Sequence, residues 1–401
     1  MRDSQLAVLG GTPAFAEALH VGRPNIGSRA GFESKLGEIL DRRWLTNAGP
    51  VVQELEKKLA AFLGVRHCIA ICNGTVALEL AIRALGLTGE VLLPSATFVA
   101  TAHSLQWQQI TPVFCDVDPA THDIDPKAAA ARITPRTTGI IGVHLWGRPC
   151  AVEGLEALAR EHDLALMFDA AHAFGCSHRG RMIGGFGRCE VFSFHATKVF
   201  NTFEGGAIAT NDDALAAKLR LMKNFGFAGF DNVVSIGVNG KMPEVCAAMG
   251  LVNLEALDGF VEANRRNHFA YREALAGVPG LAPMEYDAKE RCNWHYFVVD
   301  VDEARAGLSR DEIVRALQAE NVLARRYFFP GCHRMAPYAT LYPDAARHLP
   351  HTERLLARIL SLPNGTAVSE ETARSVAALV RRIVAEAPAV RRALRERDAA
   401  K

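Results

Sequence analysis

Short and nearly continuous apolar runs recur through the first half of the chain, separated by stretches in which apolar residues have helical spacing. Such runs indicate strands buried on both faces, and the periodic stretches between them indicate crossover helices. The predicted strands are 68–72, 90–94, 112–116, 140–145, 164–169 and 191–194. We therefore predict an α/β fold with a mostly parallel central sheet that is covered by helices.

The helix that is easiest to place begins at Pro50, since proline is favoured in the first turn of a helix. Val51, Leu55 and Leu59 fall on one face of this segment, as a helix packed against a sheet requires. Further helices are predicted at 32–40, 78–85, 97–105, 152–161, 243–264, 310–320 and 370–385.

The chain is expected to form three parts. Residues 1–30, rich in glycine and proline, predict an N-terminal arm, and residues 31–260 contain the alternating strands and helices of a large α/β domain. Residues 261–401 are expected to form a smaller α+β domain that contains a strand at Trp294–Val301. The charged tail, Arg391–Lys401, is predicted to fray.

The composition narrows the class of protein. Lys and Arg total 45 against 44 Asp and Glu, and this balance argues against a nucleic-acid or membrane-surface binder. No apolar run is long enough to cross a bilayer and no signal peptide is visible, so a cytoplasmic location is expected. The 9 cysteines form no CxxC pair, which predicts buried reduced thiols and no metal site.

Polar residues that could take part in chemistry lie where predicted strands end. Asp169 ends one strand, and Lys198 lies on the turn that follows the next strand. Ligands of parallel sheets bind at the carboxyl ends of the strands. A lysine and a carboxylate at these ends suit an aldehyde cofactor with a pyridine ring. The amine would bind the aldehyde, and the carboxylate would keep the ring nitrogen protonated so that the ring attracts electrons.

Other residues extend this candidate site. Gly74 and Thr75 precede a predicted helix and would form a phosphate cradle, and Ser193 could bind the same phosphate. Phe98 could stack on a flat ring, and His172 could reach a ring hydroxyl. Taken singly, each has an ordinary structural explanation: a helix cap, a core aromatic or a structural histidine. Their occurrence together on one predicted sheet favours the cofactor site.

Together these segments resemble a known family. The matching motifs are Cys72–Leu78, Pro94–Thr101, Asp169–Gly175, Ser193–Lys198, Glu204–Gly206 and Gly237–Met242. The chain resembles the fold type I enzymes that use pyridoxal 5′-phosphate, and more narrowly the DegT/DnrJ/EryC1/StrS aminotransferases of nucleotide-linked keto sugars. The resemblance spans nearly the whole chain and implies a mostly parallel large domain with a smaller C-terminal α+β domain.

The resemblance also implies roles for the candidate residues. Lys198 would hold the cofactor covalently and then move protons at the substrate carbon, Asp169 would pair with the ring nitrogen, and His172 would lie near the ring hydroxyl. Phe98 would stack on the ring. The residues implied to bind the phosphate are Gly74, Thr75, Ser193 and, from the neighbouring subunit, Asn239. A homodimer with shared active sites follows from the role of Asn239.

Lysine at position 198 bears on the reaction type. Some relatives carry histidine there and perform dehydration or deoxygenation, so Lys198 favours transamination. L-glutamate is the implied amino donor, and the pyridoxamine form of the cofactor is the implied carrier. Trp44–Pro50 and Ala324–Pro330 look like the branch that aminates carbon 4 of dTDP-4-keto-6-deoxyhexoses. Asn47, Arg325 and Tyr327 are therefore expected to contact substrate.

Alternatives remain at this stage. An aminotransferase acting on carbon 3 of a keto sugar or on a cyclitol would share the same scaffold, and a non-catalytic regulator would keep the fold without turnover. Gly331–Met335 departs from the family pattern, which leaves the sugar pocket open. A Rossmann dehydrogenase is not supported, because Gly184–Gly187 does not fit the GxGxxG pattern after a strand.

Overall fold

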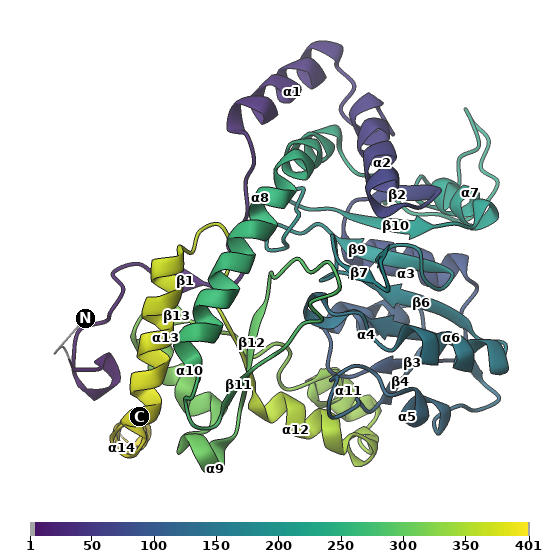
Figure 1. The fold of residues 1–401 in the computed structure, drawn as a ribbon. Helices are drawn as coiled ribbons and strands as arrows, with labels where there is room; N and C mark the ends of the chain where they lie inside the picture. Colours follow the sequence, from purple (N-terminus) through teal and green to yellow (C-terminus); the bar gives the residue numbers. More distant parts are fainter. Residues whose placement is uncertain (1–4, 400–401) are drawn as a thin grey trace.

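A computed structural model describes residues 5–399 of the chain. A seven-stranded sheet with its helices forms the large domain, and a three-stranded sheet with its helices forms the small domain (Figure 1). The large sheet has the order β2-β10-β9-β6-β5-β3-β4, and only the two pairs that involve β10 are antiparallel. This arrangement confirms the prediction of a mostly parallel central sheet.

The strands of the large sheet end close to the predicted positions. They are β2 (His67–Ile71), β3 (Glu90–Pro94), β4 (Thr111–Cys115), β5 (Thr137–Val143), β6 (Ala165–Asp169), β9 (Cys189–Ser193) and β10 (Gly206–Thr210). Side chains alternate between the two faces, so Ile69 and Ile71 contribute to one core cluster while Cys68 and Ala70 contribute to another.

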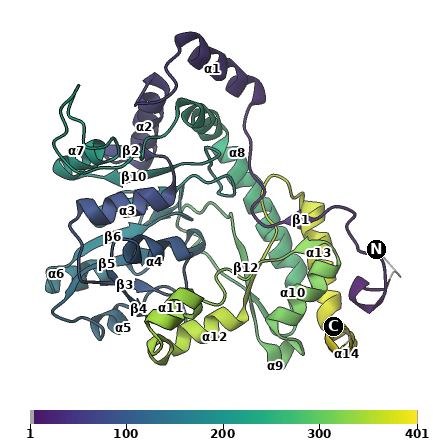
Figure 2. The ribbon, with the colours of Figure 1, turned by 180° about the vertical axis from the view of Figure 1, so that it is seen from behind.

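Helices cover both faces of this sheet (Figures 1 and 2). They are α2 (Pro50–Leu63), α3 (Gly74–Ala84), α4 (Val99–Gln106), α5 (Pro126–Ala130), α6 (Val152–Glu161) and α7 (Asp213–Met222). Helices α3, α4 and α7 bury apolar residues in the cluster that contains Ile69, and α2 and α6 bury theirs in the cluster that contains Cys68. A short hairpin of β7 (Ser177–His178) and β8 (Arg181–Met182) lies between β6 and β9 in the sequence.

One long helix joins the two domains. Helix α8 (Glu244–Leu275) extends beyond the predicted end at residue 264. Ala247 and Leu251 pack in the core of the large domain, whereas Ala270 and Tyr271 pack in the core of the small domain. The helix therefore passes from one hydrophobic core into the other without a break.

The small domain has an antiparallel sheet in the order β11-β12-β14. Its strands are β11 (Leu281–Pro283), β12 (Phe297–Val301) and β14 (Ile359–Leu362), and its helices are α9 (Glu303–Ala306), α10 (Arg310–Ala319), α12 (Pro350–Arg358), α13 (Glu370–Ala385) and α14 (Ala387–Ala399). Helix α11 (Ala336–Leu341) lies in the same part of the sequence but buries Tyr338 in the large-domain cluster that contains Ile69. The strand predicted from Trp294 begins only at Phe297, because Trp294 has a left-handed backbone with φ of 53°.

The N-terminal residues pack on the small domain. Leu6 and Val8 are buried in its core, and β1 (Leu19–His20) pairs in parallel with β13 (Val322–Leu323). Helix α1 (Arg29–Arg42), longer than the predicted 32–40, then leads to α2.

The prediction of a frayed C-terminal tail was wrong for residues 391–399, and residues 400 and 401 lie outside the described residues. Residues up to 399 form α14, and Val390 and Leu394 are buried in the small-domain core. Arg391 pairs with Glu303 and Glu312 of the same domain. The prediction failed because most of residues 391–399 are charged, and only a narrow apolar stripe indicates that the helix is amphipathic.

The prediction of buried thiols agrees with the structure. All nine cysteines are free thiols, and seven of them are buried. Within residues 5–399 no cluster of His, Cys, Asp and Glu is arranged to hold a metal ion, and no helix there is long and apolar enough to span a membrane.

Candidate active site

Asp169 lies at the carboxyl end of β6 with 6% of its surface exposed. One carboxylate oxygen accepts the Ala171 N–H at 3.0 Å, and the other accepts the Thr101 hydroxyl at 2.8 Å. Burial raises the pKa of the Asp169 carboxyl, while these two donors and the positive charge of Lys198 oppose that rise. A buried carboxylate held in this way is suited to accept a proton donor from a ligand.

Thr101 was not predicted from the sequence. It lies in the first turn of α4, and its hydroxyl is also within 3.0 Å of the Thr97 hydroxyl. The only signal in the sequence is its place at the end of the motif Pro94–Thr101. The face of α4 that carries it toward Asp169 depends on where the helix begins, and Phe98 rather than Thr97 is the N-cap residue.

Lys198 lies on the loop between β9 and β10. Its backbone N–H donates to the His195 carbonyl at 2.9 Å, and the Thr202 N–H donates to the Phe194 carbonyl at 2.9 Å, so the loop closes on itself. Burial lowers the pKa of the Lys198 amine to about 8, and the Asp169 carboxylate partly opposes this shift. A lysine with this pKa is neutral far more often than a surface lysine and can act as a nucleophile or base.

His172 faces the same site as a neutral imidazole. The Trp146 N–H donates to His172 Nδ1 at 3.2 Å, which leaves the ring proton on Nε2. Burial, with the positive charge of Lys198, holds the His172 pKa well below its ordinary value. The ring packs against Tyr296, with centroids 4.4 Å apart. Nε2 is thus fixed as a hydrogen-bond donor toward a ligand oxygen.

The start of α3 closely approaches the end of β9. The Asn73 side chain caps the helix by accepting the Val76 N–H at 2.8 Å, and the first-turn N–H groups of Gly74 and Thr75 have no partner within a helix. A methyl group on Gly74 would lie 2.9 Å from the Cβ of Ser193, so only glycine allows this approach. Ser193 and the helix N-terminus together form a place for an anion.

Aromatic residues connect these groups to the predicted substrate residues. Phe98, with 55% of its surface exposed, lies with its ring centroid 5.8 Å from that of Phe328, and Phe328 stacks on His172. Tyr327 lies 6.1 Å from Tyr296, and the Arg325 guanidinium lies 5.5 Å from the Tyr327 ring centre. Phe98, Arg325 and Tyr327 are therefore linked to His172, through the two aromatic residues that sequence reasoning missed, Tyr296 and Phe328.

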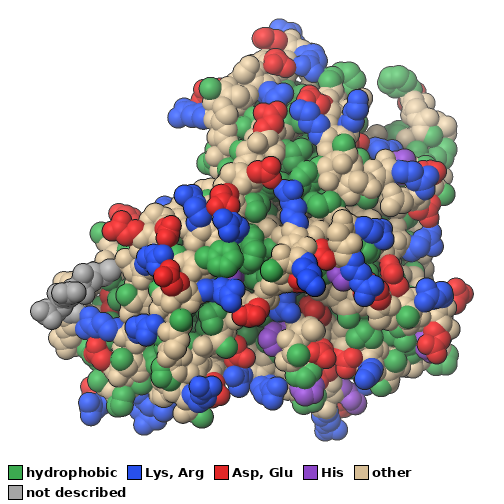
Figure 3. Space-filling view, in the orientation of Figure 1, with side chains coloured by type: hydrophobic (Ala, Val, Ile, Leu, Met, Phe, Trp, Pro, Cys, Tyr) green, Lys and Arg blue, Asp and Glu red, His purple; other side chains and the backbone are tan. Residues whose placement is uncertain are grey.

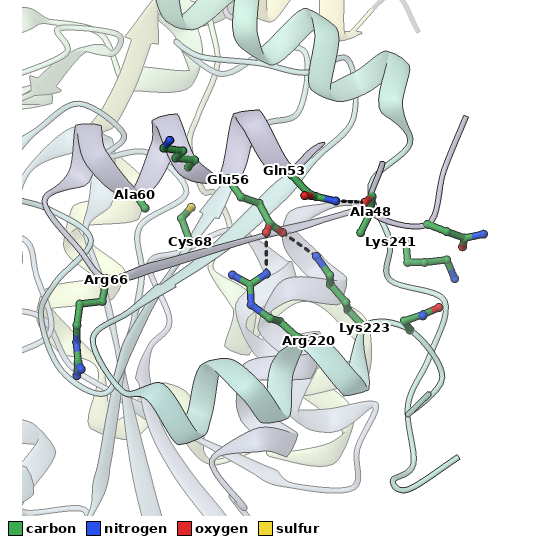
Figure 4. Close-up of a pocket in the computed structure, with 12 residues that line it drawn as sticks. Ala48, Gln53, Glu56, Ala60, Arg66, Cys68, Arg220, Lys223 and Lys241 are labelled. Atoms are coloured by element: carbon green, nitrogen blue, oxygen red, sulfur yellow. Dashed lines mark hydrogen bonds and ion pairs between the residues drawn. The ribbon is translucent and has the colours of Figure 1, made fainter. Parts of the chain in front are cut away.

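Asn47 lies elsewhere within the chain. It has a left-handed backbone and lines a cavity of about 610 Å³ beside the edge strand β2, and neither Lys198, Asp169 nor His172 lines this cavity (Figure 4). At its base, Glu56 accepts from Arg220 and Lys223, each at 2.7 Å. The single chain therefore does not bring Asn47 together with the lysine.

Glu56 and Lys223 also cover the free edge of β2. Glu56 accepts the Ala70 N–H at 2.9 Å, and Lys223 donates to the Ala70 carbonyl at 3.2 Å. Asn239 lies in the adjoining segment, where it forms an isolated bridge with Asn224, another residue that lines the cavity. Its predicted contact with the phosphate in a neighbouring subunit stays a prediction.

The chain that combines this lysine, the buried carboxylate and the anion site at the start of α3 is similar to known proteins. The profile of the DegT/DnrJ/EryC1/StrS aminotransferase family matches residues 28–381. The chain belongs to this family. It is a sugar aminotransferase that depends on pyridoxal 5′-phosphate, and its α/β architecture is that of the fold type I enzymes.

Relatives of this aminotransferase match it over most of their length. The dTDP-4-amino-4,6-dideoxy-D-glucose transaminase of Shigella dysenteriae is 38% identical over 365 residues, which cover 91% of this chain and 99% of the relative. The solved structure of DesI, obtained in the presence of its TDP-sugar product, has 49% identity and a TM-score of 0.89. That match covers 94% of this chain and 96% of DesI.

The residues of the aminotransferase fit its cofactor. The start of α3 and Ser193 offer donors to a phosphate, and a buried acceptor, Asp169, matches a protonated pyridine nitrogen. His172 Nε2 can donate to a ring hydroxyl, and Lys198 is a half-buried amine with a lowered pKa, as attachment of an aldehyde requires. We propose these cofactor contacts from the positions of the groups and from their hydrogen-bond partners.

Proposed function

We propose that the aminotransferase moves the amino group of L-glutamate to carbon 4 of dTDP-4-keto-6-deoxy-D-glucose. The product would be a 4-amino-4,6-dideoxy sugar nucleotide. The reaction type rests on one observation: Lys198, with its pKa lowered to about 8, is close enough to the buried Asp169 for their charges to interact. Support for carbon 4 comes from the Shigella relative and from an Escherichia coli transaminase of the same name, which is 36% identical over 358 residues.

Different residues of the chain have different roles in this reaction. When bound, pyridoxal 5′-phosphate supplies an aldehyde for covalent attachment and a ring that withdraws electrons. Asp169 keeps the proton on the ring nitrogen, and His172 orients the ring by donating from Nε2. Lys198, once released, removes or returns the proton at carbon 4 of the sugar. Desolvation of this amine lowers its pKa to about 8, near the working range of a base at neutral pH.

The identity of the nucleotide needs a separate test. A GDP-perosamine synthase from Caulobacter vibrioides is also 38% identical, over 313 residues that cover 77% of this chain. The dTDP-linked relative matches a larger share of the chain, 91%, and DesI was crystallised with a TDP-sugar. These two observations favour thymidine over guanosine as the nucleoside.

Carbon 4 is expected to receive the amine. Purified enzyme loaded with cofactor would be incubated with L-glutamate and one keto sugar in each of three reactions. The sugars are dTDP-4-keto-6-deoxy-D-glucose, its 3-keto isomer and the GDP-linked 4-keto sugar. We expect carbon 4 of the dTDP-linked sugar to react beside Lys198. NMR should therefore locate the new nitrogen on carbon 4 of that product. Faster turnover of the 3-keto isomer, or of the GDP-linked sugar, would refute the assignment. Glutamate would be tested by its conversion to 2-oxoglutarate.

A homodimer completes the proposal. The segment from Asn224 to Gly240 projects from the body beside α7 (Figure 1), and its tip presents apolar side chains to solvent (Figure 3). The exposed apolar residues on this hairpin are Phe225, Phe227, Phe230, Val233, Val234, Ile236 and Val238. Phe230 and Ile236 are almost fully exposed, which is unusual for a monomer with no partner.

The hairpin is held together by its own backbone hydrogen bonds. Phe227 and Val233 form a bridge, and the Val234 N–H donates to the Gly226 carbonyl at 2.9 Å. Gly226 has φ of +80°, and a methyl group on it would lie 1.7 Å from the Ser235 carbonyl oxygen, so glycine is required there. An apolar projection with internal hydrogen bonds that also carries Asn239 is suited to reach into a second copy of the chain, as a shared active site would need.

Substitutions that place negative charges on this hairpin should dissociate the dimer into monomers. Phe230→Asp combined with Ile236→Asp is expected to turn a dimer into a monomer in sedimentation analysis and to lower activity at least about tenfold, because two buried carboxylates would oppose association. Trp107→Asp is the matched control, since Trp107 is an 82% exposed aromatic residue at the C-terminal cap of α4 and not part of the hairpin. A wild-type protein that sediments as a monomer, or a charged variant that remains dimeric, would contradict the proposal.

A further inference from the structure

His295 holds the peptide carbonyl that immediately precedes Lys198. Its Nε2 lies 2.8 Å from the Thr197 carbonyl oxygen, and the ring is buried with 5% of its surface exposed. Since a carbonyl oxygen can only accept, Nε2 carries the proton and Nδ1 carries the lone pair. The contact therefore fixes one side of the Thr197–Lys198 peptide unit.

The contact reaches the lysine loop from the small-domain side of the chain. His295 lies between α8 and β12, in the segment that the left-handed backbone of Trp294 turns away from the strand. The preceding Asn293 side chain donates to the His172 carbonyl at 2.8 Å and to the Phe174 carbonyl at 3.1 Å. A single short segment thus braces both the loop that carries His172 and the loop that carries Lys198.

Thr197 is also confined from the N-terminal arm. A methyl group on Gly22 would lie 3.1 Å from the Thr197 Cβ and 3.3 Å from its carbonyl oxygen. Gly22 has φ of +79°, so its lack of a side chain serves both its backbone and this close approach. The peptide before Lys198 therefore packs against the arm and is bonded by His295.

The ring of His295 stays neutral in this position. Burial and the positive charge of Lys198 lower the pKa of His295 to about 4, although its bond to Thr197 favours the charged form. Within residues 5–399 its Nδ1 has no hydrogen-bond partner. A charged imidazole here would repel the Lys198 ammonium, whereas a neutral ring can donate without doing so.

We propose that His295 is a positioning residue that holds the Thr197–Lys198 peptide through a neutral Nε2–H, and so directs the lysine side chain toward the cofactor. This role rests on the proposed attachment of the cofactor to Lys198. If His295 has this role, holding the Thr197–Lys198 peptide requires the N–H donor at Nε2 and does not require the bulk of the ring.

Three substitutions separate the donor from the ring. His295→Gln places an amide N–H near the position of Nε2 and should keep the bond to Thr197. His295→Asn places its amide near Nδ1, too short to reach Thr197, and His295→Phe keeps the bulk without a donor. The matched control is His268→Phe, because His268 is a buried histidine of the same domain junction whose ring nitrogens bond no group within residues 5–399.

The first measurement needs neither cofactor nor turnover. Hydrogen exchange of the Lys198 backbone amide in the apo protein should be roughly 2- to 12-fold faster in the Asn and Phe variants, the factor expected for one lost hydrogen bond. The Gln variant and His268→Phe should match the wild type. Melting temperatures would be measured for all variants, so that a general loss of stability is seen separately.

The second measurement follows attachment of the cofactor to apo protein by its absorbance. We expect the attachment rate and kcat to fall about tenfold in the Asn and Phe variants, with KM for the sugar unchanged, and to recover in the Gln variant. Wild-type exchange and attachment in His295→Phe would overturn the proposal, as would a loss in His295→Gln equal to that in His295→Phe. If Lys198 is not the attachment residue, attachment will persist in Lys198→Ala while the exchange result still reports on His295.

Discussion

Replacing Lys198 by alanine should lower kcat for amine transfer by roughly 10³- to 10⁴-fold, because one residue supplies both covalent attachment and the proton transfer at the sugar carbon. The fold should persist, since removing a partly charged amine from a half-buried position relieves desolvation. Stopped-flow turnover with L-glutamate and the 4-keto sugar would measure the loss, and circular dichroism would confirm folding.

The wild-type protein adds a pH test of the same residue. The neutral amine is the nucleophile, and its pKa in the protein is about 8. Attachment of cofactor to apo enzyme should therefore quicken by about tenfold per pH unit below this value and level off above it. The matched control is Lys127→Ala, an exposed lysine at the start of α5, which should keep wild-type rates. Near wild-type turnover in Lys198→Ala would show that another group performs the chemistry.

Asp169→Asn should be the next most damaging change. The amide keeps the shape of the side chain but removes the charge that holds a proton on the ring nitrogen, and breaking a buried charge pair costs about 3–5 kcal/mol. We therefore expect kcat to fall roughly 150- to 5,000-fold, with the cofactor still attached to Lys198. Absorbance would show attachment, and single-turnover kinetics with glutamate would show the slowed proton step.

A neighbouring aspartate supplies the control for this change. Asp163 is exposed and precedes β6, and its left-handed backbone suits asparagine equally well. Asp163→Asn should leave every rate unchanged. If Asp169→Asn and Asp163→Asn behaved alike, the buried carboxylate would have no part in activating the ring, and the placement of the cofactor would have to be revised.

The positions of Asp169, Ser193 and Lys198 could be predicted because strand ends are marked in the sequence. Each follows an apolar run, and parallel strands bring such ends to one edge of the sheet. Periodicity likewise gave most of the helices of the large domain. These features depend on local pattern, which a single sequence contains.

Other parts of the site depend on information that no local pattern contains. Thr101 meets Asp169 only because α4 begins one residue after Phe98, and His295 meets Thr197 only because Trp294 adopts a left-handed backbone. Contacts between residues about a hundred positions apart follow from the packing of the two domains. The apolar stripe of α14 was likewise hidden by its surface charges.

The continuity of α8 limits how this enzyme can respond to its substrate. Its 32 residues form a rod roughly 48 Å long that is anchored in both hydrophobic cores. Two bodies joined by such a rod cannot swing about a flexible linker, so relative motion is restricted to small sliding of packed side chains. We therefore expect the enzyme to accommodate sugars of different size by rotamer changes in its aromatic wall, not by closing one domain over the other.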